Sequence, residues 1–281
     1  MKTVLVLTDF SSNAKKAAQT AVFLAGKLEL NVLLLNIYFS IPVIPAGIND
    51  AWSKSYEVFK KESETDLQNE VVRLTELFNN DMPGSAVPDL QYLSEFGDLG
   101  DHTYKLIDER NIELVVMGGR NKQQSNILFG DDINNVLKKS KRPVLIVNED
   151  FDLQNVNNIV LTTDVAASDF KVVECLNRLS DKFQFKVHVA HVSLNSNGSK
   201  EIEKTKLFTA KINQLATENV LFHNLTGKNI IEELVAFNAQ LPADLLVIVQ
   251  KRRSFLWNIF HESVSKEFIA ESKLTILVIP E

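Results

Sequence analysis

The sequence predicts two doubly wound α/β domains in one chain of 281 residues, each built on a parallel five-stranded sheet. The first observation is a repeat. An apolar run ending in Thr-Asp stands at 3–9 and again at 158–164, and another apolar run closes each half, at 144–147 and 274–279. The second is that these runs do not alternate with polar residues, which is typical of parallel strands covered by helices. The third is a length above the roughly 100–200 residues of one domain. We therefore expect a tandem duplication arranged as an internal pseudo-dimer.

The first domain, residues 1–149, alternates between predicted strands and helices. Apolar runs mark strands at 4–7, 32–35, 90–93, 114–117 and 144–147. Helices are expected at 11–28, 50–79, 99–110 and between Gly130 and the closing strand. In the first of these helices, alanines and larger apolar residues recur on one face, and Ser11 or Ser12 is available as the N-cap.

The second domain, residues 157–281, repeats this order with less sequence between its strands. Strands are expected at 158–163, 186–193, 220–225, 244–249 and 274–279, and helices at 167–183, 199–219, 229–240 and 263–272. The Asp- and Asn-rich stretch 150–157 is expected to connect the domains. Most of the extra length in the first domain lies at 37–55, which indicates an irregular excursion over one face.

Composition argues against several classes of protein. The formal net charge is -6, with 36 acidic and 30 basic residues, so no general basic surface for nucleic acid is expected. The single cysteine, Cys175, has no disulfide partner within the chain, which suits a reducing compartment. The first residues lack the pattern of a signal peptide, and the apolar stretch from Val32 is broken by Asn36, Pro42 and Pro45. We therefore expect a cytoplasmic protein that neither crosses nor binds a membrane.

Two stretches of the first domain resemble a known family. Residues 115–119 read VVMGG, Gly130 follows, and residues 142–147 read RPVLIV, after an N-terminal LVLTDFS at 5–11. In this combination the sequence resembles the universal stress protein family, in two copies. The resemblance implies a flavodoxin-like, Rossmann-like fold of the adenine nucleotide alpha hydrolase type. A Rossmann dehydrogenase would instead carry its glycine fingerprint directly after the first strand.

The resemblance also implies a nucleotide site in the first domain. Some family members bind ATP through a Gly-x2-Gly-x9-Gly-Ser/Thr loop, with an Asp after the first strand near the adenosine. The corresponding residues here are Asp9, Gly118, Gly119 and Gly130. The loop departs from the family pattern because Asn121 replaces the second glycine and Asp131 replaces the Ser/Thr. ATP or AMP is the expected ligand, bound weakly at most, because a carboxylate at position 131 repels polyphosphate.

The corresponding loop of the second domain, 250–263, contains no glycine. Asp164 and Ser263 stand at the positions equivalent to the first-domain aspartate and to the family Ser/Thr, and we expect this copy to be degenerate. At either aspartate, the alternative to a ligand contact is a structural one, in which the carboxylate caps the helix or braces the loop. His191, at a strand end, is expected to be a satisfied residue of the crevice.

We expect a general stress-response protein that senses or binds a small ligand or partner without catalysing a reaction. No residue pattern of hydrolytic or phosphoryl-transfer chemistry is present, no metal-ligand spacing occurs among the histidines, and no catalytic residue is assigned. The alternative is a slow ATPase or adenylate-handling enzyme that uses the first-domain crevice. A third hypothesis is a scaffold whose pockets are filled by Phe129 and Phe260. The sequence leaves open protein partners and a further homodimer, and it predicts that strands 144–147 and 275–279 pair across the pseudo-dimer.

Overall fold

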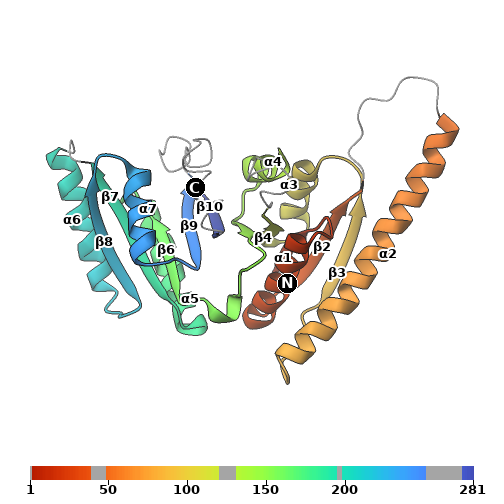
Figure 1. Cartoon of the computed structure of the whole chain (residues 1–281), viewed down its shortest axis with the longest axis horizontal. Coiled ribbons are helices and arrows are strands. Elements are labelled where there is room, and N and C mark those ends of the chain that lie inside the picture. The colour runs from red at the N-terminus through yellow and green to blue at the C-terminus, as the bar shows by residue number, and fades with distance from the viewer. Residues whose placement is uncertain (1, 39–48, 120–130, 195–197, 251–273) are drawn as a thin grey trace. The chain divides into compact units, whose positions relative to one another are not determined.

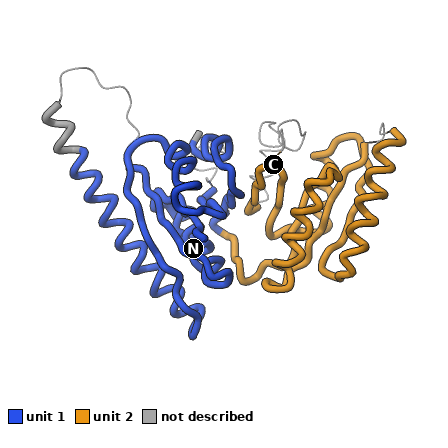
Figure 2. The backbone as a smooth tube through the Cα atoms, turned by 180° about the vertical axis from the view of Figure 1, so that it is seen from behind, with its two compact units in different colours: residues 1–149 blue, residues 150–281 orange. Residues whose placement is uncertain are grey.

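The structure, a computed structural model, describes residues 2–38, 49–119, 131–194, 198–250 and 274–281. The chain divides into two compact units, Met1–Glu149 and Asp150–Glu281 (Figure 2). Each unit has its own hydrophobic core. The helix predicted at 263–272 and the side chains Phe129 and Phe260 lie outside the described residues.

Unit 1 alternates strictly between strands and helices (Figure 1). Its elements are β1 (Thr3–Leu7), α1 (Ser12–Leu28), β2 (Asn31–Ile37), α2 (Asn49–Asp81), β3 (Leu90–Glu95), α3 (Leu99–Glu109), β4 (Ile112–Gly118), α4 (Asp131–Lys139) and β5 (Val144–Val147). The strands lie in the order β3-β2-β1-β4-β5, and all neighbouring pairs are parallel. Helices α1 and α2 pack on each other, as do α3 and α4, so right-handed crossovers place one pair on each face. The predicted doubly wound fold is confirmed.

Helix α1 follows from its sequence in a simple way. Ser11 is the N-cap, and its hydroxyl accepts a hydrogen bond from the backbone N–H of Ala14 at 3.3 Å. The small residues predicted to form one face are buried, with Ala17, Ala18 and Ala21 all fully inaccessible. The helix ends where Glu29 adopts the left-handed conformation, at φ 56°. The prediction of a helix over 11–28 is confirmed.

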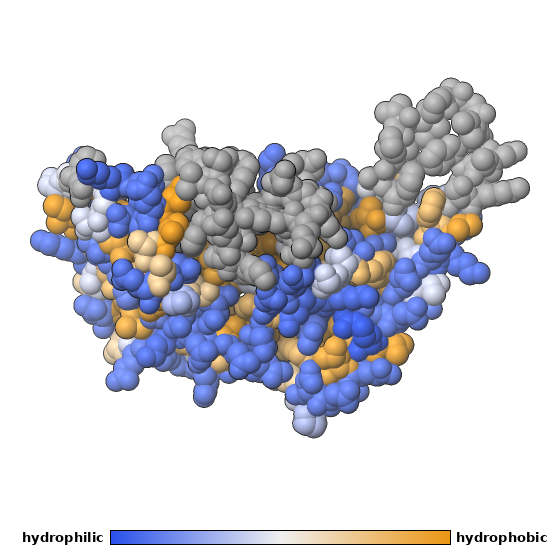
Figure 3. Space-filling model, viewed as in Figure 1, coloured by the Kyte–Doolittle hydropathy of each residue, from blue (hydrophilic) through white to orange (hydrophobic). Residues whose placement is uncertain are grey.

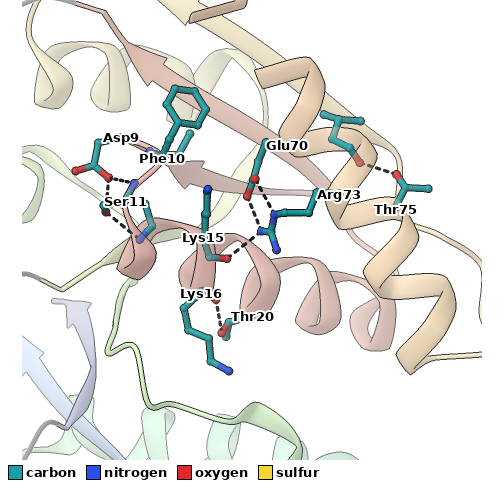
Figure 4. A network of polar contacts seen from close by, with 12 residues as sticks. Asp9, Phe10, Ser11, Lys15, Lys16, Thr20, Glu70, Arg73 and Thr75 are labelled. Carbon is teal, nitrogen blue, oxygen red and sulfur yellow. Dashed lines mark hydrogen bonds and ion pairs between the residues drawn. The ribbon is translucent and has the colours of Figure 1, made fainter. Parts of the chain in front are cut away.

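Helix α2 is unusually long, at 33 residues, and includes residues 49–55 of the expected excursion. Its later part is fixed to α1, because Arg73 forms two hydrogen bonds with Glu70 (2.6 and 2.8 Å) and donates a third to the carbonyl of Lys15 at 3.3 Å (Figure 4). The N-terminal part of the helix runs past the ends of β2 and β3 (Figure 1). Residues 56–59, 61 and 62 are exposed, and residue 60 is only half-buried.

An aromatic cluster supports this projecting part of α2. Tyr56 packs against Tyr38 and Phe96, which directly follow β2 and β3, with ring centroids 5.5 and 6.0 Å away. Burial and a hydrogen bond with Tyr56 raise the pKa of the Tyr38 hydroxyl. The cluster thus lies at the carboxyl edge of the sheet, beside the ends of β2 and β3.

Unit 2 repeats the architecture. Its elements are a short 3-10 helix (Leu153–Asn155), β6 (Asn158–Thr162), α5 (Ala167–Phe183), β7 (Lys186–Leu194), α6 (Ser199–Gln214), β8 (Val220–Gly227), α7 (Ile230–Gln240), β9 (Leu245–Gln250) and β10 (Thr275–Pro280). The strands lie in the order β10-β9-β6-β7-β8, and all neighbouring pairs are parallel. Most of the predicted elements agree with these bounds.

One predicted helix was too long. The sequence predicts a helix over 199–219, but α6 ends at Gln214. The chain tightens there, because the N–H of Leu215 bonds to the carbonyl of Ile212 at 3.0 Å, and Ala216 then adopts the left-handed conformation at φ 48°. This reversal directs the chain toward β8.

The visible surface is mostly hydrophilic, with apolar residues scattered across it (Figure 3). The exposed apolar side chains include Val58 and Val72 on α2 and Ile202 and Leu207 on α6. Among the described residues, no helix is both long and apolar enough to cross a membrane.

Candidate functional site

The turn after β1 carries the first predicted site residue, Asp9. Its Oδ1 accepts hydrogen bonds from the backbone N–H of Ser11 (3.1 Å) and from the Ser11 hydroxyl (2.5 Å), and the side chain remains exposed (Figure 4). Phe10 adopts a left-handed φ of 61°, and its N–H donates to Thr8 Oγ1 at 3.1 Å. Asp9 therefore braces the loop as the structural alternative predicted, and it also presents a carboxylate to solvent at the carboxyl edge of the sheet.

A buried polar network lies beneath this turn. Asn36, at the end of β2, donates from Nδ2 to the carbonyl of Thr8 at 2.7 Å. Its Oδ1 accepts from the Ser63 hydroxyl of α2 at 2.7 Å, and Ser63 also bonds to the hydroxyl of Ser94 on β3 at 2.6 Å. The network joins three strands to α2. Sequence reasoning missed it, although an asparagine inside an apolar strand was a signal, because a buried amide requires hydrogen-bond partners.

Gly118, at the end of β4, lies against the first turn of α1. A Cβ at this position would be 2.6 Å from the carbonyl carbon of Asn13 and 2.7 Å from the nitrogen of Ala14. Because these are backbone atoms, they cannot move aside without displacing the helix. The close approach of strand and helix therefore requires glycine here, whether or not a ligand binds.

Gly119 is held by backbone hydrogen bonds. Its N–H donates to the carbonyl of Val147 at 2.8 Å, and its carbonyl accepts from Asn13 Nδ2. A Cβ here would make ordinary contacts, 3.5 Å from the Val147 oxygen. Its N–H is thus engaged within the sheet. Gly130 lies outside the described residues.

Helix α4, which follows the loop, is fixed to α3 by polar contacts. Lys139 donates to Asp98 at 2.9 Å and to Asp101 at 2.7 Å, and Asn135 donates to Asp98 at 2.6 Å. The hydrogen bond from Lys139 is the main cause that lowers the pKa of Asp98, and the bond to Asp101 is the main cause that raises the pKa of Lys139. Gly100 permits the close packing, since a Cβ there would be 2.7 Å from Asn135 Oδ1. These contacts hold α4 against the start of α3.

Unit 2 contains the same turn. Asp164 Oδ1 accepts from the N–H of Ala166 at 3.3 Å, and Val165 has a left-handed φ of 55°, with its N–H donating to Thr163 Oγ1 at 2.9 Å. The Thr163 hydroxyl in turn donates to Asp169, a buried carboxylate on α5, at 2.7 Å. Asp164 thus has the same bracing role as its counterpart in unit 1.

The position of Gly118 is different in unit 2. The strand registers pair Leu7 with Met117 in unit 1 and Thr162 with Ile248 in unit 2, so Val249 takes the place of Gly118. Its side chain is buried. Ser263 lies outside the described residues.

Histidines gather on β7 and β8. His188 bonds to Asn158 and His223, each at 3.1 Å, and the His223 ring packs on Phe237 with centroids 4.9 Å apart. Burial lowers the pKa of both rings. In the described part of the chain, no cluster of three or more His, Cys, Asp or Glu side chains is arranged to hold a metal ion.

The comparisons with known proteins agree with this fold. The model of the universal stress protein family matches residues 1–148, and the chain belongs to that family. Universal stress protein MJ0577 of Methanocaldococcus jannaschii is 29% identical over 160 residues, covering 52% of this chain and 94% of the relative.

Two solved structures match both halves of the chain. A universal stress protein from Archaeoglobus fulgidus has a TM-score of 0.71 at 17% identity, covering 99% of this chain and 96% of its own. A putative universal stress protein from Pseudomonas aeruginosa has a TM-score of 0.59 at 14% identity, with coverages of 99% and 92%. At these identities the likeness shows the fold. The predicted family and fold class are confirmed.

Proposed function

We propose that this chain is a non-enzymatic stress-response protein whose first unit binds an adenine nucleotide, ATP or AMP. The observation that carries the proposal is the exposed carboxylate of Asp9, held on a rigid turn at the point where the strand order reverses between β1 and β4. In open α/β sheets, ligands bind at such a switch point. A carboxylate fixed there is an acceptor for the hydroxyls of a ribose.

The two units carry different side chains around the turn, and these side chains affect whether a nucleotide can bind. In unit 1, Ala14 stands at the third position of α1 and Gly118 brings no side chain to the edge. In unit 2, the equivalent positions carry the Asp169 carboxylate and the Val249 side chain. A buried carboxylate disfavours a phosphorylated ligand. We therefore propose that only unit 1 binds the nucleotide.

The glycines at the end of β4 would contribute little to direct contacts with the nucleotide. Because the N–H of Gly119 already donates to Val147, this N–H is not available to a phosphate. Gly118 contributes by letting α1 lie close to β4. Gly130 remains a predicted residue of the nucleotide site.

Calorimetric titration of the nucleotide-free protein with ATP and AMP tests the proposal. Asp9→Asn is the informative variant because the amide keeps an Oδ1 that accepts from Ser11 while removing the charge. Asp164→Asn is its matched control, since it makes the same change in the same turn of unit 2. We expect saturable binding, weakened roughly tenfold or more by Asp9→Asn and unchanged by Asp164→Asn. No binding of either nucleotide, or equal weakening by both variants, would overturn it.

Phosphate release from ATP separates binding from the enzymatic alternative. Turnover by the wild-type protein that is lost in Asp9→Ala would establish the slow ATPase instead. Binding without turnover supports the non-enzymatic function.

A further inference from the structure

One side chain near the end of β2 and one in β7 contact equivalent backbone carbonyls in the two units. The registers pair Leu7 with Leu35 and Thr162 with Ala190, so His191 occupies in unit 2 the position of Asn36 in unit 1. Asn36 donates to the carbonyl of Thr8 at 2.7 Å, and His191 Nδ1 lies 3.0 Å from the carbonyl of Thr163. Each side chain thus holds the last carbonyl before the Asp turn.

Asn36 and His191 differ in the contact that each makes with the helix that follows its strand. Asn36 Oδ1 accepts a neutral hydrogen bond from Ser63 of α2. His191 Nε2 instead faces Oε1 of Glu201, in the first turn of α6, at 3.4 Å. No partner among the described residues gives Nε2 a hydrogen bond of normal geometry, and the His191 side chain is only 4% exposed.

The contact with Thr163 fixes the tautomer of His191. A carbonyl only accepts, so Nδ1 must carry a hydrogen, and a neutral ring then directs the lone pair of Nε2 toward the Glu201 carboxylate. That arrangement is repulsive, with the ring buried and the Glu201 side chain 29% exposed. A second proton on the ring turns the same contact into a charge-assisted hydrogen bond. Histidine is the side chain whose charge changes near neutral pH.

The other groups around His191 do not supply a competing positive charge. Asp169 on α5 reaches the same residue through the Thr163 hydroxyl, Asp164 follows Thr163 in the chain, and neutral Asn224 on β8 is paired with His191 in register. The basic residues of these elements, such as Lys171 on α5, Lys186 on β7 and Lys200 and Lys204 on α6, are exposed, and Glu201 is the charged group that faces the His191 ring.

We propose that His191 and Glu201 form a proton-dependent brace, which fastens the first turn of α6 to the ends of β6 and β7 when His191 is charged and releases it as the pH rises. Unit 1 has the pH-independent form of the same brace. The second unit is thereby a pH-responsive copy of the fold, independently of whether the first unit binds a nucleotide.

Hydrogen exchange of the full chain between pH 5.5 and 8, corrected for the intrinsic exchange rate, tests the brace. We expect protection of amides 200–204 to fall roughly three- to tenfold as the pH rises, while amides 63–67 of α2 stay constant. His191→Asn, which copies Asn36, should keep unit 2 folded and abolish the change. Glu201→Gln should abolish it as well.

Nitrogen shifts of the His191 ring give a direct check that does not depend on a variant. Nδ1 should remain protonated across this range while Nε2 gains a proton as the pH falls. Equal protection of amides 200–204 at both pH values in the wild-type protein, or an unchanged pH response in folded His191→Asn, would refute the proposal. The His188 and His223 pair does not confuse the result, because it packs on Phe237 of α7 rather than on α6.

Discussion

The carboxyl edges of the two units share one turn and differ in the charge around it. Both turns place a threonine, an aspartate and a left-handed residue in sequence, with matching hydrogen bonds. The neighbouring positions are Ala14, Asn36 and Ser63 in unit 1 and Asp169, His191 and Glu201 in unit 2. The shared turn therefore belongs to the fold, and the proposed differences in ligand binding and in the response to protons depend on the side chains around it.

The largest expected difference between the units concerns the end of β4. Gly118→Val should destabilise unit 1 by about 3 kcal/mol, because the new side chain meets the backbone of α1. The equivalent position in unit 2 already holds a valine. Urea unfolding, followed by fluorescence and circular dichroism to resolve the two units, measures the effect.

Gly119→Ala is the control for this variant. A Cβ there makes ordinary contacts, so the change should cost less than about 1 kcal/mol. If both variants were equally mild, the close approach of β4 to α1 would not depend on glycine.

A smaller difference is expected between the equivalent helices α3 and α7. Asp98 and Asn229 are their N-caps, but Asp98 also bonds to Lys139 and Asn135. Asp98→Ala should therefore cost about 2 kcal/mol and Asn229→Ala about 1 kcal/mol, as measured by denaturant unfolding. A larger loss for Asn229→Ala would show that the contacts between α3 and α4 add nothing.

The smallest expected effect is a loss of folding stability at low pH that is caused by two histidines of unit 2. Because burial lowers the pKa of His188 and His223 in the folded state, the unfolded chain binds more protons as the pH falls below about 6.5. Their contribution to stability is complete above that pH and is lost as the pH falls through the lowered pKa values. Thermal unfolding between pH 5 and 8 should show this loss, and His223→Phe should reduce it.

His102→Gln provides the comparison for this measurement. His102 lies in unit 1 and bonds through Nε2 to the carbonyl of Phe96, which glutamine can also reach. The loss of thermal stability at low pH should remain in His102→Gln. If this loss disappeared in both His223→Phe and His102→Gln, or in neither, it could not be attributed to His188 and His223.

Most of the fold could be predicted from the sequence because its signals are local. Apolar runs such as 144–147 and the alanine face of α1 specify strands and helices through neighbours in the chain. The error at the end of α6 is also local, since the left-handed Ala216 has no glycine to mark it. The family resemblance followed from the order of elements repeated in both halves and, most sharply, from motifs in the first half.

The candidate site was predicted less completely because its contacts join distant residues. Asp9 was found from its place after a strand, but the link from Asn36 to Ser63 crosses 27 positions and the pair of His188 with His223 crosses 35. Gly118 was identified from the family loop, whereas the structure shows that it also meets a steric requirement of α1. Only the strand registers reveal that His191 replaces Asn36.

Because α2 is long, its first residues extend beyond the described contacts that hold the helix to the sheet. Toward the N-terminus, the last described contact of this helix is the packing of Tyr56 on Tyr38 and Phe96. The 7 residues from Asn49 to Ser55 lie beyond that contact and span about 10 Å. A tilt of roughly 10° about Tyr56 would displace the start of the helix by roughly 2 Å. Because Tyr38 and Phe96 directly follow β2 and β3, the aromatic cluster would transmit such a tilt to the carboxyl edge of the sheet.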